Sequence, residues 1–253
     1  MKIFSPLLLF LLLSLSLVKA QNRISQQNHP LAWGAAANTY SGNLYVQLPI
    51  LQLVSTDLPI EVRLHYNSDQ FEQMQQIGLG WSLDPLMSYR KESGNVILSG
   101  VDGQKREFTL SGSELIAPVG SFDSLQSVQD SIILTKVDGT QWIFADSVQK
   151  QLSLIRNRNG QQIDFTYDGT HLTDLSDGAG QAVHFGWMGG QLRTIWEDND
   201  GQRRVWTFRY AGQKLIAISG PEGLQYRFRY DEAGRMIQMA RADSNSLDFQ
   251  YWP

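Results

Sequence analysis

Acidic, basic and glycine residues gather in a few short stretches that could carry chemistry. The clearest is "FRYDEAGRMIQM", residues 228–239, in which Asp231 and Arg235 flank Gly234. An aspartate and an arginine around a glycine suit either a small binding site or a tight turn. In a turn, glycine adopts the positive φ and the aspartate accepts backbone hydrogen bonds. The two interpretations predict different classes of protein, and the surrounding sequence decides between them.

The other reactive residue types argue against an enzyme. Cysteine is absent, and the four histidines show no metal-ligand spacing. We expect His184 to lie on the solvated face of a strand. The stretch "EDNDG" at 197–201 begins like a calcium loop, but the twelfth loop position falls on Arg209, which favours a hairpin turn. We assign no catalytic, metal-binding or cofactor-binding residue.

A Gly-x-Gly also occurs in "IGLGWS", but it does not complete a phosphate-binding fingerprint. That fingerprint requires a third glycine and a following helix, and the Asp84-Pro85 pair soon interrupts any helix. The sequence instead favours a tight turn at Gly78 and Gly80 that places Trp81 in the core.

A repeat of about 21 residues organises the second half of the chain. The leading glycines lie 21, 20, 21 and 22 residues apart, at Gly139, Gly160, Gly180, Gly201 and Gly223. Each unit carries two aromatic residues at a spacing of two, so both rings lie on one face of a strand. The pairs are Trp142/Phe144, Phe165/Tyr167, Phe185/Trp187, Phe208/Tyr210, Phe228/Tyr230 and Phe249/Tyr251.

A short glycine-bearing link and a second apolar run follow each aromatic strand, which predicts that each repeat is a β-hairpin. The second runs break strict alternation, because Leu172 and Leu175, like Leu192 and Ile195, are three residues apart. Either a β-bulge or a strand that is apolar on both faces would explain this spacing.

The chain contains seven Trp, nine Tyr and eleven Phe residues, and such rings could stack on sugars or on bases. Because they recur with period two in every repeat, we expect most of them to form one buried sheet face. Several exposed tryptophans in a row would favour a glycan-binding face. Burial of Trp142, Trp187 and Trp206 would weaken that hypothesis.

Composition and the amino terminus indicate an exported globular protein. The net charge of −4 provides no basic surface that would attract nucleic acid or an anionic membrane. Residues 1–20 are typical of a signal peptide that is cleaved after Ala20. The alternative is an uncleaved anchor helix, but the apolar run is shorter than the roughly 20 residues a membrane span needs. Residues 21–30 are expected to be an exposed linker, and without cysteine no disulfide can form.

The sequence "YDEAGRM" resembles the YD repeat, also called the Rhs repeat, whose pattern is Tyr-Asp-x-x-Gly-Arg-Leu. Met236 takes the place of the leucine, and "YDGTHL" retains the first two residues and the last. The other units have lost more of the pattern. The residues that carry the repeat motif are Tyr167, Asp168, Gly169, Leu172, Tyr230, Asp231, Gly234, Arg235 and Met236.

A second resemblance lies upstream, in "LHYNS" and "GLGWSL". It is similar to the leading segment of Rhs proteins and of SpvB-type subunits of toxin complexes. The matching residues are Tyr66, Asn67, Ser68, Gly78, Gly80 and Trp81. The resemblance implies an all-β protein whose hairpins wind into a spiral, which in large members forms a hollow shell around a carboxy-terminal toxin.

The sequence therefore predicts an all-β fold of antiparallel hairpin repeats that form a curled or spiral sheet, a partial YD-repeat shell. An amino-terminal β segment, 31–99, leads into repeats at 100–253, which stop within a repeat. Either the chain is a fragment, or its last edge is capped by a partner or by its own amino-terminal segment.

The predicted function is that of an exported, non-enzymatic scaffold in a cell-surface or toxin-shell type assembly. A surface carbohydrate-binding module is the alternative, and a secreted hydrolase ranks third. Expected partners are a further repeat-bearing chain or a second copy at the exposed strand edge, or a glycan. We expect no cofactor, no nucleic acid and no membrane span after cleavage.

Overall fold

The computed structural model describes residues 28–38, 41–54, 58–72, 74–75, 77–101, 103–145, 150–199 and 201–251. The predicted signal peptide and its cleavage site lie outside these residues. The described part consists of strands, turns and two short 3₁₀ segments, so the all-β prediction is confirmed. None of its segments is a helix long and apolar enough to cross a membrane.

A five-stranded antiparallel sheet forms the amino-terminal part, in the order β1-β2-β3-β4-β7. The last three residues of the linker expected at 21–30 form strand β1. Buried and partly exposed residues alternate over the first five residues of β3 and of β4, so one face of this sheet is apolar there. The bounds are β1 (Asn28–Pro30), β2 (Ala35–Asn38), β3 (Leu44–Leu53), β4 (Ile60–Asn67) and β7 (Trp81–Asp84), with η2 (Ser68–Gln70) and a small hairpin of β5 (Met74–Gln75) and β6 (Gly78–Leu79) before β7.

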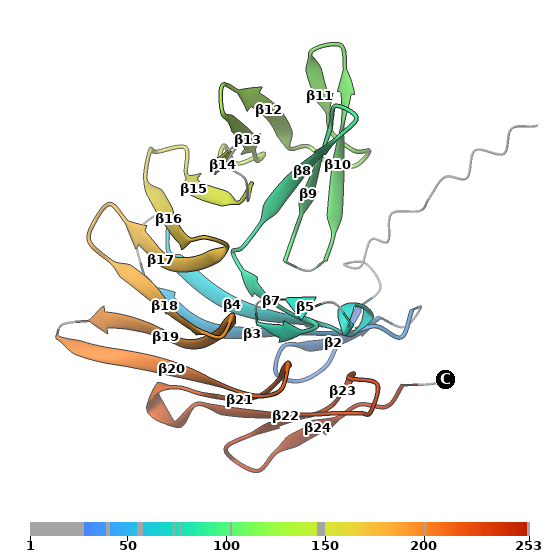
Figure 1. The fold of residues 1–253 in the computed structure, drawn as a ribbon, viewed down its shortest axis with the longest axis vertical. Helices are drawn as coiled ribbons and strands as arrows, with labels where there is room; N and C mark the ends of the chain where they lie inside the picture. The colour runs from blue at the N-terminus through green and yellow to red at the C-terminus, as the bar shows by residue number, and fades with distance from the viewer. Residues whose placement is uncertain are drawn as a thin grey trace, which may run out of the picture.

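The remaining strands form one long antiparallel ribbon, in which each strand pairs with the next along the chain. Figure 1 shows that the ribbon curls from β8 around to β24 and that the amino-terminal sheet lies inside the curl. The bounds are β8 (Ser88–Glu92), β9 (Asn95–Ser99), β10 (Lys105–Ser111), β11 (Glu114–Ile116), β12 (Ser124–Val128), β13 (Ser131–Thr135), β14 (Gln141–Ala145), β15 (Leu152–Arg156), β16 (Gln162–Asp168), β17 (His171–Asp177), β18 (Ala182–Met188), β19 (Gln191–Asn199), β20 (Gln202–Ala211), β21 (Lys214–Ser219), β22 (Gln225–Tyr230), β23 (Met236–Arg241) and β24 (Ser246–Asp248), with η3 (Pro221–Gly223) between β21 and β22.

The first part of the ribbon closes on itself beside β15. The backbone N–H of Tyr89 donates to Lys150 O at 3.0 Å, and that of Leu152 donates to Met87 O at 2.9 Å. These bonds join the start of β8 to β15, so the strands from β16 onward continue as an open extension of a closed turn of sheet.

A β-bulge explains the three-residue apolar spacing. In the hairpin β16–β17, Tyr167 faces Leu172 while Phe165 faces Leu175, so Thr173 is the extra residue. The same shift precedes the second aromatic residue in β18–β19, β20–β21 and β22–β23. The bulge keeps both apolar residues of the return strand on the aromatic face, and Leu172 and Leu175 are both fully buried.

One hydrophobic core joins the two sheets. The apolar face of β3, β4 and β7 packs against the aromatic face of the repeats, so a single cluster of buried residues runs from Ala35 to Met239. The curled sheet is therefore filled by the chain's own amino-terminal segment.

Candidate functional site: the seam between the amino-terminal sheet and the repeats

In four of the repeats, the second aromatic residue is tied to the preceding hairpin by a hydrogen bond. In each case a ring O–H or N–H donates to the backbone carbonyl of the first or second residue of the preceding return strand. The pairs are Tyr167 to Leu152 at 2.7 Å, Trp187 Nε1 to Leu172 at 2.7 Å, Tyr230 to Leu215 at 2.6 Å and Tyr251 to Met236 at 2.9 Å. We call this series the aromatic ladder.

The ladder explains a regularity that the sequence analysis missed. In five of the six aromatic pairs the first ring is Phe and the second is Tyr or Trp. The exception is the pair Trp142/Phe144, in which the order is reversed. Tyr and Trp carry a polar hydrogen that needs an acceptor when buried, and Phe does not. The identity of the second ring could therefore have indicated which position makes the bond between repeats.

The ladder has one interruption. The buried hydroxyl of Tyr210 has no hydrogen-bond partner among the described residues, and the guanidinium of Arg193 lies 5.0 Å from its ring centre. The amino-terminal segment contacts the same hairpin, because Leu79 N–H donates to Gln213 O at 3.1 Å.

The two motifs that the sequence analysis identified separately meet in space. Met236 N–H donates to the Tyr66 hydroxyl at 2.8 Å, across 170 positions of sequence. Trp81 Nε1 donates to the Tyr230 hydroxyl at 2.9 Å, across 149 positions. The Trp81 ring also packs on Phe228, with centroids 4.9 Å apart. We call this contact the seam, and Tyr230 belongs to both the seam and the ladder.

Glycine is required where Trp81 enters the seam. Gly80 has φ +73°, and a Cβ there would lie 2.8 Å from the Tyr66 ring. Gly78 has φ +122°, and a Cβ there would lie 2.9 Å from Gln213 O. Both positions combine a positive φ with a close approach, Gly78 to the repeats and Gly80 to Tyr66 of its own sheet. A side chain at Gly78 would push the repeats away, and one at Gly80 would displace the Tyr66 ring of the seam.

Asn67 and Ser68 fix the end of β4. The Asn67 side chain accepts a hydrogen bond from Asp69 N–H at 2.9 Å. The Ser68 hydroxyl accepts from Leu44 N–H and donates to Asn43 Oδ1, both at 2.8 Å. These side chains replace strand pairing at the point where β4 stops, and their contacts are those of a cap.

The stretch "YDEAGR" forms a turn. Asp231 Oδ1 accepts from Arg235 N–H at 2.8 Å, and Oδ2 accepts from Arg235 Nε at 2.9 Å. Gly234 has φ +101°. Burial would raise the pKa of Asp231, but the hydrogen bonds and charge of Arg235 outweigh it and hold that pKa below its usual value. The earlier unit turns more tightly, with Asp168 paired to His171 and Gly169 at φ +59°.

Burial keeps the tyrosines of the seam and the ladder protonated. It raises the pKa of Tyr66 and Tyr230 far above the usual value, and that of Tyr251 to about 12, where burial again dominates. At neutral pH these groups donate and accept hydrogen bonds as phenols. Their arrangement supports packing rather than proton transfer.

Two of the histidines, His65 and His184, each lie beside an aspartate and an aromatic ring. His184 lies on the outer face of β18, where Nδ1 is 2.6 Å from Asp174 Oδ1 and the ring stacks on Trp196. His65 is buried between the Tyr45 hydroxyl and Asp84, whose Oδ2 lies 3.5 Å from Nε2. The described residues contain no group of three metal-ligating side chains.

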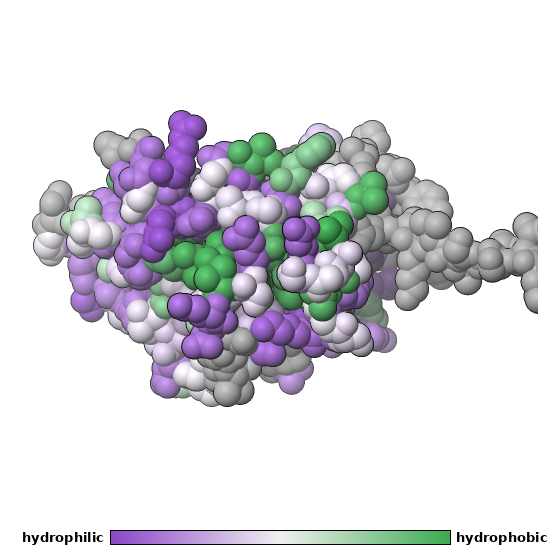
Figure 2. Space-filling model, turned by 90° about the horizontal axis from the view of Figure 1, so that it is seen from above, coloured by the Kyte–Doolittle hydropathy of each residue, from purple (hydrophilic) through white to green (hydrophobic). Residues whose placement is uncertain are grey.

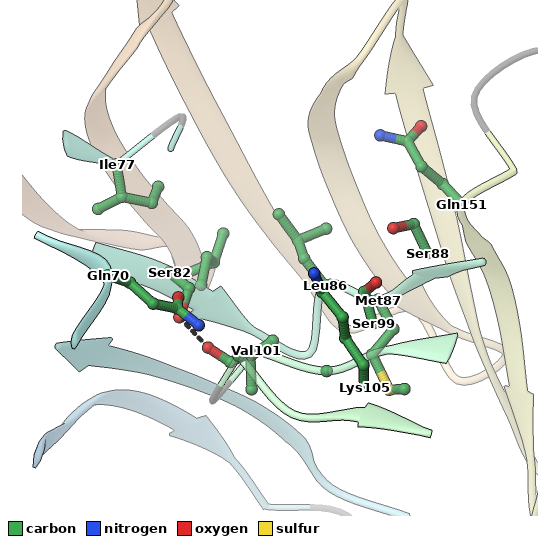
Figure 3. Close-up of a pocket in the computed structure, with 13 residues that line it drawn as sticks. Gln70, Ile77, Ser82, Leu86, Met87, Ser88, Ser99, Val101, Lys105 and Gln151 are labelled. Carbon is green, nitrogen blue, oxygen red and sulfur yellow. Dashed lines mark hydrogen bonds between the residues drawn. The ribbon is translucent and has the colours of Figure 1, made fainter. Parts of the chain in front are cut away.

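A cavity of about 430 Å³ lies between β7, the β8–β9 hairpin and β15 (Figure 3). Its lining is mostly apolar and amide or hydroxyl in character, and Ser82 Oγ donates to Val101 O. Among the described residues of the lining, Lys105 is the one ionisable side chain.

The tryptophans do not form an exposed row in the described part of the chain. Trp206 is buried, and Trp142 and Trp187 are partly buried against the core. The described residues therefore lack the row of exposed tryptophans that would favour a glycan-binding sheet face.

Large exposed apolar side chains gather instead at the end that carries β10 to β13. Figure 2 looks at this end and shows apolar side chains between polar ones. Five of the ten large exposed apolar side chains of the described residues lie in 110–128, namely Leu110, Ile116, Val119, Phe122 and Val128.

These features define an all-β hairpin-repeat protein whose curled sheet is filled by its own amino-terminal sheet. Residues 210–246, which include β22 and β23, match the RHS Repeat family. The chain thus carries an RHS repeat, and the resemblance seen in "YDEAGRM" is confirmed. A comparison with curated proteins found no match.

Two crystal structures are similar to this chain. That of TcdB2-TccC3 is 12% identical, with a TM-score of 0.48, over 84% of this chain and 16% of that chain. That of TcdB2-TccC3-Cdc42 is 13% identical, with a TM-score of 0.47, over 78% of this chain and 16% of that chain. The chain thus spans about one sixth of the length of either protein.

Proposed function

We propose that this chain is an exported, non-enzymatic scaffold, a section of a Rhs-type shell at the cell surface or in a toxin-related assembly. The observation that carries the proposal is the aromatic ladder. Four of the six second rings bind the hairpin before them, and the series continues to Tyr251. A repeat that carries such a ring thus brings its own bond to its neighbour, which is how repeat proteins extend.

The partner we propose is a strand of a further repeat-bearing chain or of a second copy. Among the described residues, the residue register of β24 is with β23, so its other edge presents unpaired backbone groups. Phe249 N–H donates to Ile237 O of β23 at 2.9 Å. Because neighbouring residues of a strand point to opposite sides, the N–H of Asp248 points to the open edge.

Sedimentation of the exported wild-type protein and of two single variants tests this proposal. Asp248→Pro removes the N–H that points outward, whereas Asp248→Ala removes the same side chain and keeps the N–H. We expect the wild type and Asp248→Ala to associate with a second copy or a repeat-bearing chain, and Asp248→Pro to lose this association. Equal behaviour of the two variants would rule out the strand edge.

Amino-terminal sequencing of protein recovered outside the cell tests export. The expected first residue is Gln21. Retention inside the cell, or a mature protein that begins with Met1, would contradict the export part of the proposal.

A further inference from the structure

Four polar residues form a row across the sheet where the start of β8 meets β15. Lys105 of β10 lies opposite Ser99 of β9, and Ser99 lies opposite Ser88 of β8. Ser88 is in turn bridged to Gln151, which directly precedes β15. Residues directly opposite each other in an antiparallel sheet lie on the same face. The four side chains are therefore neighbours on one face, and we call them the polar row.

The polar row lines the cavity of about 430 Å³ between β7, the β8–β9 hairpin and β15. Figure 3 shows the Lys105 side chain directed into this cavity. The volume lies within the roughly 300–1,000 Å³ of typical ligand pockets. Because strands lie about 4.8 Å apart, the row spans about 14 Å, the length of about four extended residues at about 3.4 Å each.

An apolar wall lies across the cavity from the polar row. Ile77 and Leu83 of this wall are buried, and Leu86 and Met87 are partly buried against the core. A peptide backbone carries an N–H and a C=O at each residue, which hydroxyl and amide side chains bind. Apolar side chains of the same peptide would contact the wall. The cavity thus suits a short extended segment of chain.

The two ends of the polar row differ in charge. Lys105, which is exposed, is the one ionisable side chain among the described residues of the lining. This end therefore favours a single negative charge. At the other end, in an exposed position, Gln151 Nε2 donates to Thr170 O at 3.0 Å, which leaves the side-chain oxygen as an acceptor. A bound chain can thus enter past Gln151 and end at Lys105.

We propose that this cavity binds the carboxy-terminal end of an extended peptide whose last residue is apolar. The terminal carboxylate pairs with the Lys105 ammonium, and the preceding peptide groups bind the hydroxyls and the amide of the polar row. The last side chain contacts Leu86 and Met87. Such a site tethers the end of another protein to the scaffold, at a place separate from the open edge of β24.

Calorimetric titration of the whole chain with the peptide acetyl-Ala-Ala-Leu tests the proposal. We expect saturable binding of the free acid and about fivefold weaker binding of the same peptide with a carboxamide end. Octanoate carries a carboxylate and an apolar group but no peptide groups, so it should bind at least fivefold more weakly than the free acid.

Three variants separate the site from the fold. Lys105→Gln should weaken binding of the free acid about fivefold at an unchanged melting temperature, and should leave binding of the carboxamide unchanged. Ser99→Ala removes a hydroxyl from the middle of the polar row and should weaken binding of both peptides severalfold. Lys91→Gln is the matched control, because Lys91 belongs to the same hairpin but lines a different cavity. It should bind as the wild type does.

Four results would overturn the site: no saturable binding of the free acid, equal binding of the carboxamide, equal binding of octanoate, or unchanged affinity in Lys105→Gln. None of them depends on whether β24 recruits a partner strand. Failure of this site and failure of the scaffold proposal are therefore distinguishable.

Discussion

The Tyr230 hydroxyl connects three elements, and its removal should destabilise the protein more than the removal of any other ladder hydroxyl. Tyr230→Phe leaves Trp81 Nε1 without its acceptor and Leu215 O without its donor, and both residues are fully buried. A buried polar group that loses its partner costs about 1–3 kcal/mol. The Leu215 carbonyl has two lone pairs, so the loss of one donor costs less there than the loss of the acceptor costs at Trp81 Nε1. For the two groups together we expect a loss of about 2–4 kcal/mol in the free energy of unfolding.

Two other tyrosines provide a graded comparison. Tyr251→Phe removes the bond to Met236 O and should cost about 1 kcal/mol. Tyr226 is similarly buried, but its hydroxyl makes no hydrogen bond to any described residue, so Tyr226→Phe should cost less than about 0.5 kcal/mol. The assay is urea denaturation followed by tryptophan fluorescence, with midpoints compared at an unchanged slope.

A double-mutant cycle isolates the seam bond. Trp81→Phe and Tyr230→Phe should show a coupling energy of about 0.5–3 kcal/mol, because the two side chains share one hydrogen bond. Additive effects, or equal losses for Tyr230→Phe and Tyr226→Phe, would refute the assignment of this hydroxyl as the link between the sheets.

Three further predictions follow from the turns and the buried phenols. Gly234→Ala should lower the free energy of unfolding by about 1–2 kcal/mol because φ is +101°, while Gly178→Ala, in open space without a positive φ, should change it by less than about 0.5 kcal/mol; equal melting temperatures would contradict this. Since burial raises the pKa of the ladder and seam tyrosines, their contribution is complete below about pH 10 and is lost as the pH rises further, by up to about 1.4 kcal/mol per pH unit for each tyrosine. Denaturation midpoints and phenolate absorbance measured together check this, and titration near pH 10 in the folded protein would contradict it. The depressed pKa of Asp231 stabilises the fold above about pH 4 and loses its effect as the pH falls, so Asp231→Asn should flatten the acid limb of the stability profile.

The hairpins could be predicted from the sequence because their signals are local. The paired aromatics two residues apart and the glycine-bearing links lie within about ten residues of one another, which is the range over which strand periodicity operates. The bulge stayed ambiguous because a three-residue apolar spacing fits either a bulge or a strand buried on both faces. Only the register of Tyr167 with Leu172 resolves it.

The seam could not be predicted from the sequence. The residue types of Tyr66 and Trp81 indicate burial, but nothing in their neighbourhood specifies Met236 or Tyr230 as partners. Contacts across such distances depend on how far the ribbon curls, and this is the sum of many small strand twists. The ion pair of the buried Glu197 with Arg204, at 2.8 Å, could not be predicted for a similar reason, because "EDNDG" fits a turn and an incomplete calcium loop equally well.

The aromatic ladder also allows the hairpins to form in sequence while the chain is being synthesised. In every rung the acceptor lies 15 residues before the donor, so the ribosome has already made the carbonyl when the ring that binds it emerges. Hairpins can therefore join one by one as the chain lengthens, with little loop closure at each step. The seam joins residues 149 and 170 positions apart, and Tyr66 and Trp81 must wait for almost the whole chain before their partners exist.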